Sequence, residues 1–171
     1  LKQDWSFHTM TDTKTETLKF KLELWATHWD KPPVAEILIN DTSHYRAEIT
    51  STEDKPTVIE FEHTLNDGEE YNLKIVRSGK DRRQTVVENG EIAQDQLLHI
   101  KSIEIDEIDI GALVYEGIYT PDYPEPWATQ QRSAGQELPV SFKNVSTMGH
   151  NGVWQLQFAS PFYMWLLENL Y

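Results

Sequence analysis

The clearest pattern in the chain is an alternation of apolar and polar residues that begins at Leu18. Over residues 18–27 every second residue is apolar, and most of the positions between them are charged or hydroxylic. A period of two places successive side chains on opposite faces of an extended strand, so this segment predicts a half-buried β-strand. Pro32 and Pro33 follow it, and because proline cannot donate to a sheet ladder, the strand must end before them.

Short segments with the same period recur along the chain at intervals of about ten residues, separated by turn-forming residues. The further segments predicted as strands are 34–39, 45–49, 58–63, 71–76, 97–110, 140–142 and 153–158. In the segment 97–110 the apolar parity changes between Ile105 and Ile108, which predicts a bulge or bend at Asp106 and Glu107. The pattern as a whole favours a mostly-β fold, an antiparallel β-sandwich of the jelly-roll kind.

A polar stretch from residue 78 to residue 95 is predicted to hold one small hairpin. Its strands would be 84–87 and 91–93, joined through Glu88-Asn89-Gly90. Asn-Gly is a favoured pair for a tight hairpin turn, which is the reason for this prediction.

Residues 160–171 predict a short C-terminal helix, with Ser160 as its N-cap and Pro161 as its first residue. The segment is apolar on nearly every face, whereas a helix on a protein surface normally has a polar side. We therefore expect it either to insert into a core or to dock on another subunit. The residues expected to dock are Phe162, Tyr163, Trp165, Leu166, Leu170 and Tyr171.

The first 15 residues are polar apart from Trp5, Phe7 and Met10, and they read as an N-terminal arm. The aromatic residues would anchor the arm to a partner or pack onto the arm's own domain. Residues 16–171 are predicted to form a single β-sandwich domain: a core over 16–110, followed over 111–171 by an aromatic loop, a hairpin and the terminal helix.

Composition narrows the classes of partner. The net charge of −13 argues against nucleic acid, since phosphate binding needs a basic surface. No apolar run approaches the roughly 20 residues of a membrane span. The N-terminal residues lack the apolar region of a signal peptide, so we expect synthesis in the cytoplasm. With no cysteine, disulfides and zinc–thiolate sites are excluded.

Motifs of catalysis are missing from the sequence, so we expect no enzyme. There is no Gly-x-Ser-x-Gly elbow, no thiol and no glycine cluster to hold phosphate, and the histidines are scattered singly. His63 and His99 fall inside predicted strands, where we expect hydrogen-bonded structural roles. Paired carboxylates, as in glycosidases, and a triad assembled in space leave an enzymatic alternative open.

Carboxylates outside the predicted strands suggest calcium, which takes six to eight oxygen ligands, often from loops. The candidate ligands are Asp41, Asp81, Glu88 and Asp95. No helical-hand loop of the EF type is present, and the alternative is that the acidic charge only confers solubility.

Aromatic residues near strand ends suggest a binding surface. Three prolines between Tyr119 and Trp127 predict an extended loop without regular structure. The candidate glycan or interface aromatics are Trp29, Tyr119, Tyr123 and Trp127. Exposed rings stack on sugars or anchor interfaces, although prolines and aromatics also pack against each other over a sandwich.

Over residues 16–110 the chain resembles calcium-dependent, xylan-binding-type carbohydrate-binding modules. The resemblance is carried by residues 20–24, 35–41 and 95–105. It implies a jelly-roll sandwich, bound calcium and a polysaccharide partner. Asn40-Asp41 stands where that family has Asp-Gly, and residues 77–94 replace its asparagine-rich calcium loop.

Residues 119–131, 148–152 and 160–171 resemble segments of uncharacterised proteins encoded by marine tailed bacteriophages. This second resemblance implies a virion protein: a capsid decoration or a tail or fibre component that docks on other virion proteins through its aromatic ends, with host-glycan contact and self-association as further expectations. The alternative function is a freestanding, calcium-dependent polysaccharide-binding module.

Overall fold

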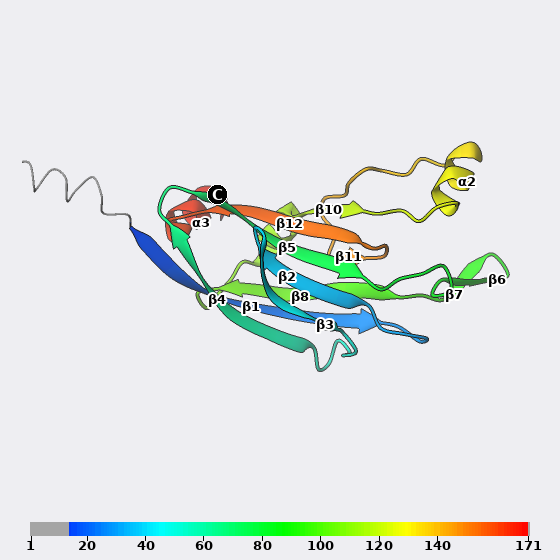
Figure 1. Ribbon diagram of the computed structural model, residues 1–171, viewed down its shortest axis with the longest axis horizontal. Helices are drawn as coiled ribbons and strands as arrows, with labels where there is room; N and C mark the ends of the chain where they lie inside the picture. The colour runs from blue at the N-terminus through cyan, green and yellow to red at the C-terminus, as the bar shows by residue number, and fades with distance from the viewer. Residues whose placement is uncertain (1–13, 171) are drawn as a thin grey trace, which may run out of the picture.

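The computed structural model describes residues 14–170, which are organised around two antiparallel sheets packed face to face (Figure 1). One sheet, called sheet A here, has the order β11-β8-β1-β4, with β9 paired to β8, and sheet B has the order β10-β12-β5-β2-β3. A separate two-stranded ribbon is formed by β6 and β7. The strands are β1 (Thr15–Thr27), β2 (Val34–Ile39), β3 (Thr42–Glu48), β4 (Thr57–Asn66), β5 (Glu70–Ser78), β6 (Val86–Glu88), β7 (Glu91–Gln94), β8 (Leu97–Ile105), β9 (Ile108–Asp109), β10 (Ile118–Pro121), β11 (Thr147–Met148) and β12 (Gly152–Ala159). The helices are the 3₁₀-helix η1 (Gly111–Glu116), α2 (Trp127–Ser133) and α3 (Phe162–Leu170).

The alternation of apolar and polar residues in the sequence corresponds to an alternation of buried and less buried side chains in the strands. In β1 every second residue from Leu18 to Ala26 is buried between the sheets, and the residues between them point outward or are partly covered. The same holds in β5 and β12, so the two inner faces form one hydrophobic core. Successive strands repeatedly change sheets, and the predicted antiparallel β-sandwich is confirmed.

Two local predictions are also confirmed. The parity change between Ile105 and Ile108 coincides with a tight turn between β8 and β9, in which Asp106 and Glu107 both have positive φ angles, 52° and 66°. The small hairpin exists as the ribbon β6–β7, with its turn at Asn89-Gly90.

Two other local predictions are wrong. Residues 140–142 form no strand and make a single bridge, from Phe142 to Tyr119, because Val140 is exposed and has no sheet to pack against. The loop predicted over residues 119–127 is partly regular. Pro121 is the last residue of β10, where a missing N–H is tolerated, and α2 begins at Trp127 directly after Pro126.

The predicted C-terminal helix is confirmed as α3, but Ser160 does not cap it. The Ser160 N–H still donates to Glu69 O at 3.1 Å, as a continuation of β12 along β5. Glu16 caps the helix instead: the Phe162 N–H donates to its Oε2 at 2.8 Å, and the Ser160 hydroxyl donates to the same oxygen. A carboxylate from the start of β1 therefore satisfies the first amide of α3.

The sandwich has two distinct ends (Figure 1). The start of β1 and α3 lie at one end, called the helix end here. The loops that include α2 and the ribbon β6–β7 extend at the other, called the loop end. The predicted N-terminal arm lies almost wholly outside the described residues, Trp5, Phe7 and Met10 included, and Thr15 already belongs to β1. Between residues 14 and 170 no helix has both the length and the apolar character to cross a bilayer.

Buried Arg77 connects the loop end to the sandwich by hydrogen bonds. It lies on β5 with 1% of its surface exposed, and its guanidinium donates to the backbone oxygens of Met148, at 3.3 Å, and Gln96, and to Asn151 Oδ1 at 2.9 Å. Burial lowers the pKa of Arg77 to about 10, which still leaves it positively charged at neutral pH. The Arg77 side chain thus connects β5 to two segments that are distant from it in the sequence, one at Gln96 and one at residues 148–151.

Candidate functional site

Two of the predicted aromatics, Tyr123 and Trp127, meet at the loop end together with His150, which the sequence did not suggest. Ring centroids are 5.4 Å apart between Trp127 and His150 and 5.1 Å apart between Tyr123 and His150. The Tyr123 hydroxyl donates to the carbonyl of Pro139, which holds that ring in place. We call these three residues the aromatic cluster. His150 lies in a turn far along the chain, and no local pattern links it to the other two.

The aromatic cluster is uncharged at neutral pH. The pKa of His150 is lowered first by burial and then by the positive charges of Lys80 and Arg77. A neutral imidazole beside Trp127 gives an amphipathic surface: flat ring faces with polar ring edges.

Trp29, a third candidate, is exposed and belongs to the β1–β2 loop, which lies at the same end of the sandwich (Figure 1). Its Nε1–H donates to Gln84 O at 2.9 Å, and the buried Gln84 amide donates to Asp30 at 2.8 Å. Five tryptophans fall in residues 14–170, and only two are exposed, Trp29 at 47% and Trp127 at 36%. Both exposed indoles are therefore at the loop end.

Tyr119, the fourth candidate, is not at the surface. It is 3% exposed, and its hydroxyl both donates to His150 O and accepts from the His150 N–H at 2.8 Å. Burial raises its pKa to about 12. Tyr119 therefore supports the segment that carries His150 and offers no ring face to a ligand, which corrects the prediction from sequence.

The proposed calcium ligands are not brought together. Asp41 lies in the β2–β3 turn, at the end of sheet B where β5 begins, whereas Asp81 follows the end of β5. Glu88 is on the exposed ribbon and Asp95 follows β7. Within residues 14–170 no three side chains among His, Asp and Glu are grouped so that they could hold a metal ion.

Three of these carboxylates already have cationic partners, and the exposed Asp41 is 3.9 Å from Lys74 Nζ. Asp95 is 2.8 Å from Lys80 Nζ and accepts a hydrogen bond from the Thr85 hydroxyl, also at 2.8 Å. Burial raises the pKa of Asp95, but these bonds outweigh it and leave the pKa below its usual value. Asp81 pairs with Lys31 and Arg83, at 3.0 and 3.3 Å, and the Arg83 contacts lower its pKa most. These residues do not fit a calcium ion.

The histidines predicted to be structural are hydrogen-bonded. His63 Nδ1 and His44 Nε2 are 2.8 Å apart and join β4 of sheet A to β3 of sheet B. Burial lowers the pKa of both rings, and the neighbouring His44 lowers that of His63 further. His99 bonds to Thr27 and to Thr147, both at 2.9 Å.

The helix α3 divides the predicted docking residues. Phe162 and Leu166 are buried in the core and Trp165 is half-buried against it, whereas Tyr163 and Leu170 are exposed. Tyr171 lies outside the described residues. Helical spacing places the exposed residues on one continuous surface, called the exposed α3 face. Its members are Tyr163, Met164, Leu167 and Leu170.

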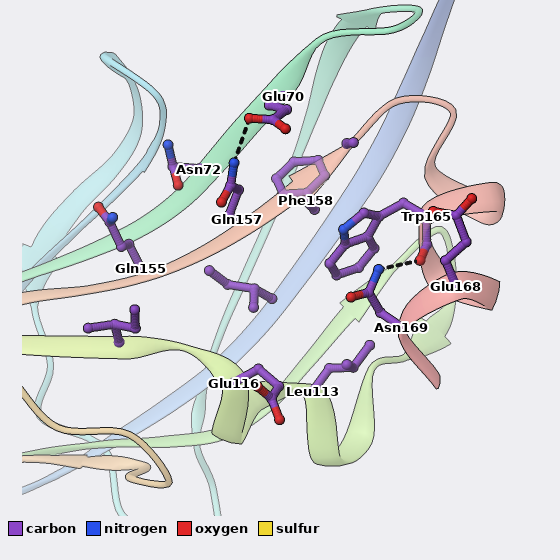
Figure 2. Close-up of a pocket in the computed structure, with 13 residues that line it drawn as sticks. Glu70, Asn72, Leu113, Glu116, Gln155, Gln157, Phe158, Trp165, Glu168 and Asn169 are labelled. Atoms are coloured by element: carbon purple, nitrogen blue, oxygen red, sulfur yellow. Dashed lines mark hydrogen bonds between the residues drawn. The ribbon is translucent and has the colours of Figure 1, made fainter. Parts of the chain in front are cut away.

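A groove of about 600 Å³ lies beside α3, lined by residues of β5, β12, β10, η1 and α3 (Figure 2). No lysine, arginine or histidine lines it, whereas three glutamates do: Glu70, Glu116 and Glu168. Glu70 accepts a hydrogen bond from Gln157 Nε2 at 2.6 Å, across the outer face of sheet B. We call this feature the acidic groove. Its residues come from elements distant in sequence, so no spacing predicted it.

Comparison with known proteins identifies no family. No protein-family model matches the chain, and no curated protein matches it. The structure is similar to the selenomethionine form of vCBM60, solved in a study of circular permutation between two families of calcium-dependent carbohydrate-binding modules, with a TM-score of 0.46, 7% identity and coverage of 81% of this chain and 88% of that chain. It is also similar to vCBM60 in complex with galactobiose, with a TM-score of 0.43, 9% identity and coverage of 80% and 95%.

Proposed function

We propose that the protein is a carbohydrate-binding protein whose contact surface is the loop end, with Trp127 of the aromatic cluster as its main contact and Trp29 as a second. The observation that supports this is the location of both exposed indoles of residues 14–170 at that one end. Sugar rings have apolar C–H faces, which pack on aromatic rings while their hydroxyls remain available to polar groups.

Both indoles are held in place before any ligand arrives. Trp29 is fixed by its bond to Gln84 O, and Trp127 by Tyr123 and His150. Rings that are already ordered lose little conformational entropy on binding, so more of the contact energy becomes affinity. The mode of action is binding without chemistry.

Replacing Trp127 by alanine tests this proposal. In affinity electrophoresis through gels that contain xylan or galactan, we expect the wild-type chain to be retarded by at least one polysaccharide. W127A should weaken that binding at least about tenfold, because a central aromatic contact carries much of the affinity of a small interface. Y163A removes an exposed aromatic ring at the opposite end and is the matched control, expected to bind as wild type.

The outcomes separate the alternatives. Retardation that EDTA abolishes would favour a calcium-dependent module and contradict the calcium-free surface proposed here. Equal retardation of W127A and wild type, or no retardation in any gel, would overturn carbohydrate binding at the aromatic cluster.

We also propose a second function, as a virion component that docks on other virion proteins; the exposed α3 face supports docking on a partner. Four adjacent apolar side chains exposed on one helix are unusual for a surface without a partner. We expect M164E/L167E to remain folded but to be absent from purified particles, as judged by mass spectrometry, where the wild-type chain is present. V87E/I92E on the exposed ribbon removes a comparable apolar pair and is the control. Normal incorporation of M164E/L167E would contradict docking through α3.

A further inference from the structure

Half of β12 lacks a partner strand on one of its two sides. On the first side β5 pairs with it along its whole length, from Gly152 to Ala159. On the second side β10 pairs only as far as Gln155, which lies opposite Ile118, the first residue of β10. Residues 156–159 are therefore an open sheet edge, and this edge lies in the acidic groove.

The orientation of the backbone groups on this edge follows from the alternation of an antiparallel ladder. The Ser160 N–H donates to Glu69 on the β5 side. Tyr119 exchanges both its bonds with Phe142, so its neighbours Ile118 and Thr120 face β12 opposite Gln155 and Val153.

The odd-numbered residues of β12 therefore point away from β5. In the open half, the N–H and C=O groups of Gln157 and Ala159 point out of the edge, and no hydrogen bond to them is formed within residues 14–170. Two donors and two acceptors, spaced two residues apart, are the template that an added strand requires.

The groove provides room along this edge without closing it. η1 contributes Leu113 and Glu116 on one side, and α3 contributes Trp165 and Glu168 on the other (Figure 2). Four residues of open strand are about 14 Å long, enough to pair with a segment of four or five residues.

The residues that line the acidic groove indicate the kind of ligand that fits it. The apolar residues Leu113 and Trp165 line the groove with the edge, and the partly exposed Trp165 suits an apolar side chain of a ligand. The three glutamates, with no basic residue among the lining, suit cationic side chains between them. We infer that the open edge of β12 binds an extended peptide with alternating apolar and basic residues, which pairs with Gln157 and Ala159 as an added strand.

A carbohydrate fits this groove less well. The Trp165 ring stacks on Phe162 with centroids 6.0 Å apart and lies nearly perpendicular to the Phe158 ring at 6.3 Å, so two core rings already pack against it. The regular spacing of the free backbone groups also matches a polypeptide rather than a sugar chain.

The test uses a fluorescein-labelled peptide of alternating lysine and valine, measured by fluorescence anisotropy at low salt. A peptide of alternating glutamate and valine controls for charge. A lysine–valine peptide that is N-methylated at alternate residues keeps the charge but loses the donors of the added strand. We expect binding of the first peptide only, with shifts of the Gln157 and Ala159 amide signals in NMR spectra.

Variants of the protein locate the site. E116Q/E168Q should weaken binding about tenfold by removing two groove charges, whereas E60Q/E62Q makes the same charge change at two exposed positions of β4 and should bind as wild type. A159P removes an outward N–H that no internal bond uses, and it should also abolish binding. Circular dichroism and thermal unfolding show that each variant is folded.

Several results would overturn the inference. Equal binding of the N-methylated peptide would show attraction by charge alone. Unshifted Gln157 and Ala159 signals would place the peptide elsewhere. Shifts of those signals by xylan or galactan would assign the edge to carbohydrate, and a wild-type dimer that A159P dissociates would assign it to a second copy of the chain.

Discussion

Replacing Arg77 with methionine is expected to lower the free energy of unfolding by about 3–5 kcal/mol. Methionine fills similar space but removes the Arg77 donor from the carbonyls of Met148 and Gln96, and it leaves Asn151 Oδ1 with one of its two donors, the Lys80 N–H. A buried acceptor that loses a charged donor costs more than a mean hydrogen bond, because water cannot replace the donor. Urea denaturation followed by tryptophan fluorescence measures the loss.

R46M is the matched control for that experiment. Arg46 lies on β3 and is exposed, so its replacement should change stability by less than about 0.5 kcal/mol. R77M should also weaken carbohydrate binding at neutral pH, because Asn151 is adjacent to His150 of the aromatic cluster. A loss below about 1 kcal/mol for R77M would show that water reaches these acceptors and that Arg77 does not organise the loop end.

Replacing Phe162 with alanine is expected to cost about 3–5 kcal/mol of unfolding free energy. The side chain is 0% exposed and packs against the rings of Phe158 and Trp165, so truncation leaves a cavity in the core. L167A, on the exposed α3 face at 62% exposure, should change stability by less than about 0.5 kcal/mol. Thermal unfolding of the two variants makes the comparison.

Equal and small effects of F162A and L167A would mean that α3 is detached from the core in solution. The expected difference in stability between F162A and L167A also determines which variants can test docking by this helix. Deleting residues 161–171 would remove Phe162 and Leu166 from the core, so a failure to assemble would report unfolding. Substitutions on the exposed α3 face avoid that confusion.

Much of the fold could be predicted because it follows from the local periodicity of apolar residues. A strand with one buried face needs a period of two, and β1, β2, β5 and β12 carry it clearly. The turn at Asp106 and Glu107 could be located because a change of parity has to be absorbed somewhere in the backbone. The helix at residues 162–170 follows from its length and its apolar residues.

The features of the fold that could not be predicted depend on contacts between residues distant in sequence. Ser160 has the right residue type for an N-cap, yet the cap comes from Glu16 because β1 begins beside α3. The prolines between residues 119 and 127 predict an irregular loop, but two of them adjoin regular structure. Their number does not reveal that one ends an edge strand and another precedes a helix.

The candidate sites also depend on the tertiary fold. Exposure separates Trp127 from Tyr119, and exposure is decided by the tertiary fold rather than by the residue type. The acidic groove arises because β10 is shorter than β12, a difference in pairing that no single segment records. Sequence could name the aromatic residues, but only the fold shows which of them a ligand can reach.

The place of β12 within sheet B has a consequence for how the chain folds during synthesis. β12 lies between β5 and β10, so neither of these can complete its pairing until residues 152–159 have left the ribosome. Until then one edge of β5 is unpaired, and the apolar inner face of sheet B lacks the strand between β5 and β10. The sandwich therefore closes only after residue 159 is available, through contacts between strands distant in sequence, which is the slow, aggregation-exposed regime of folding.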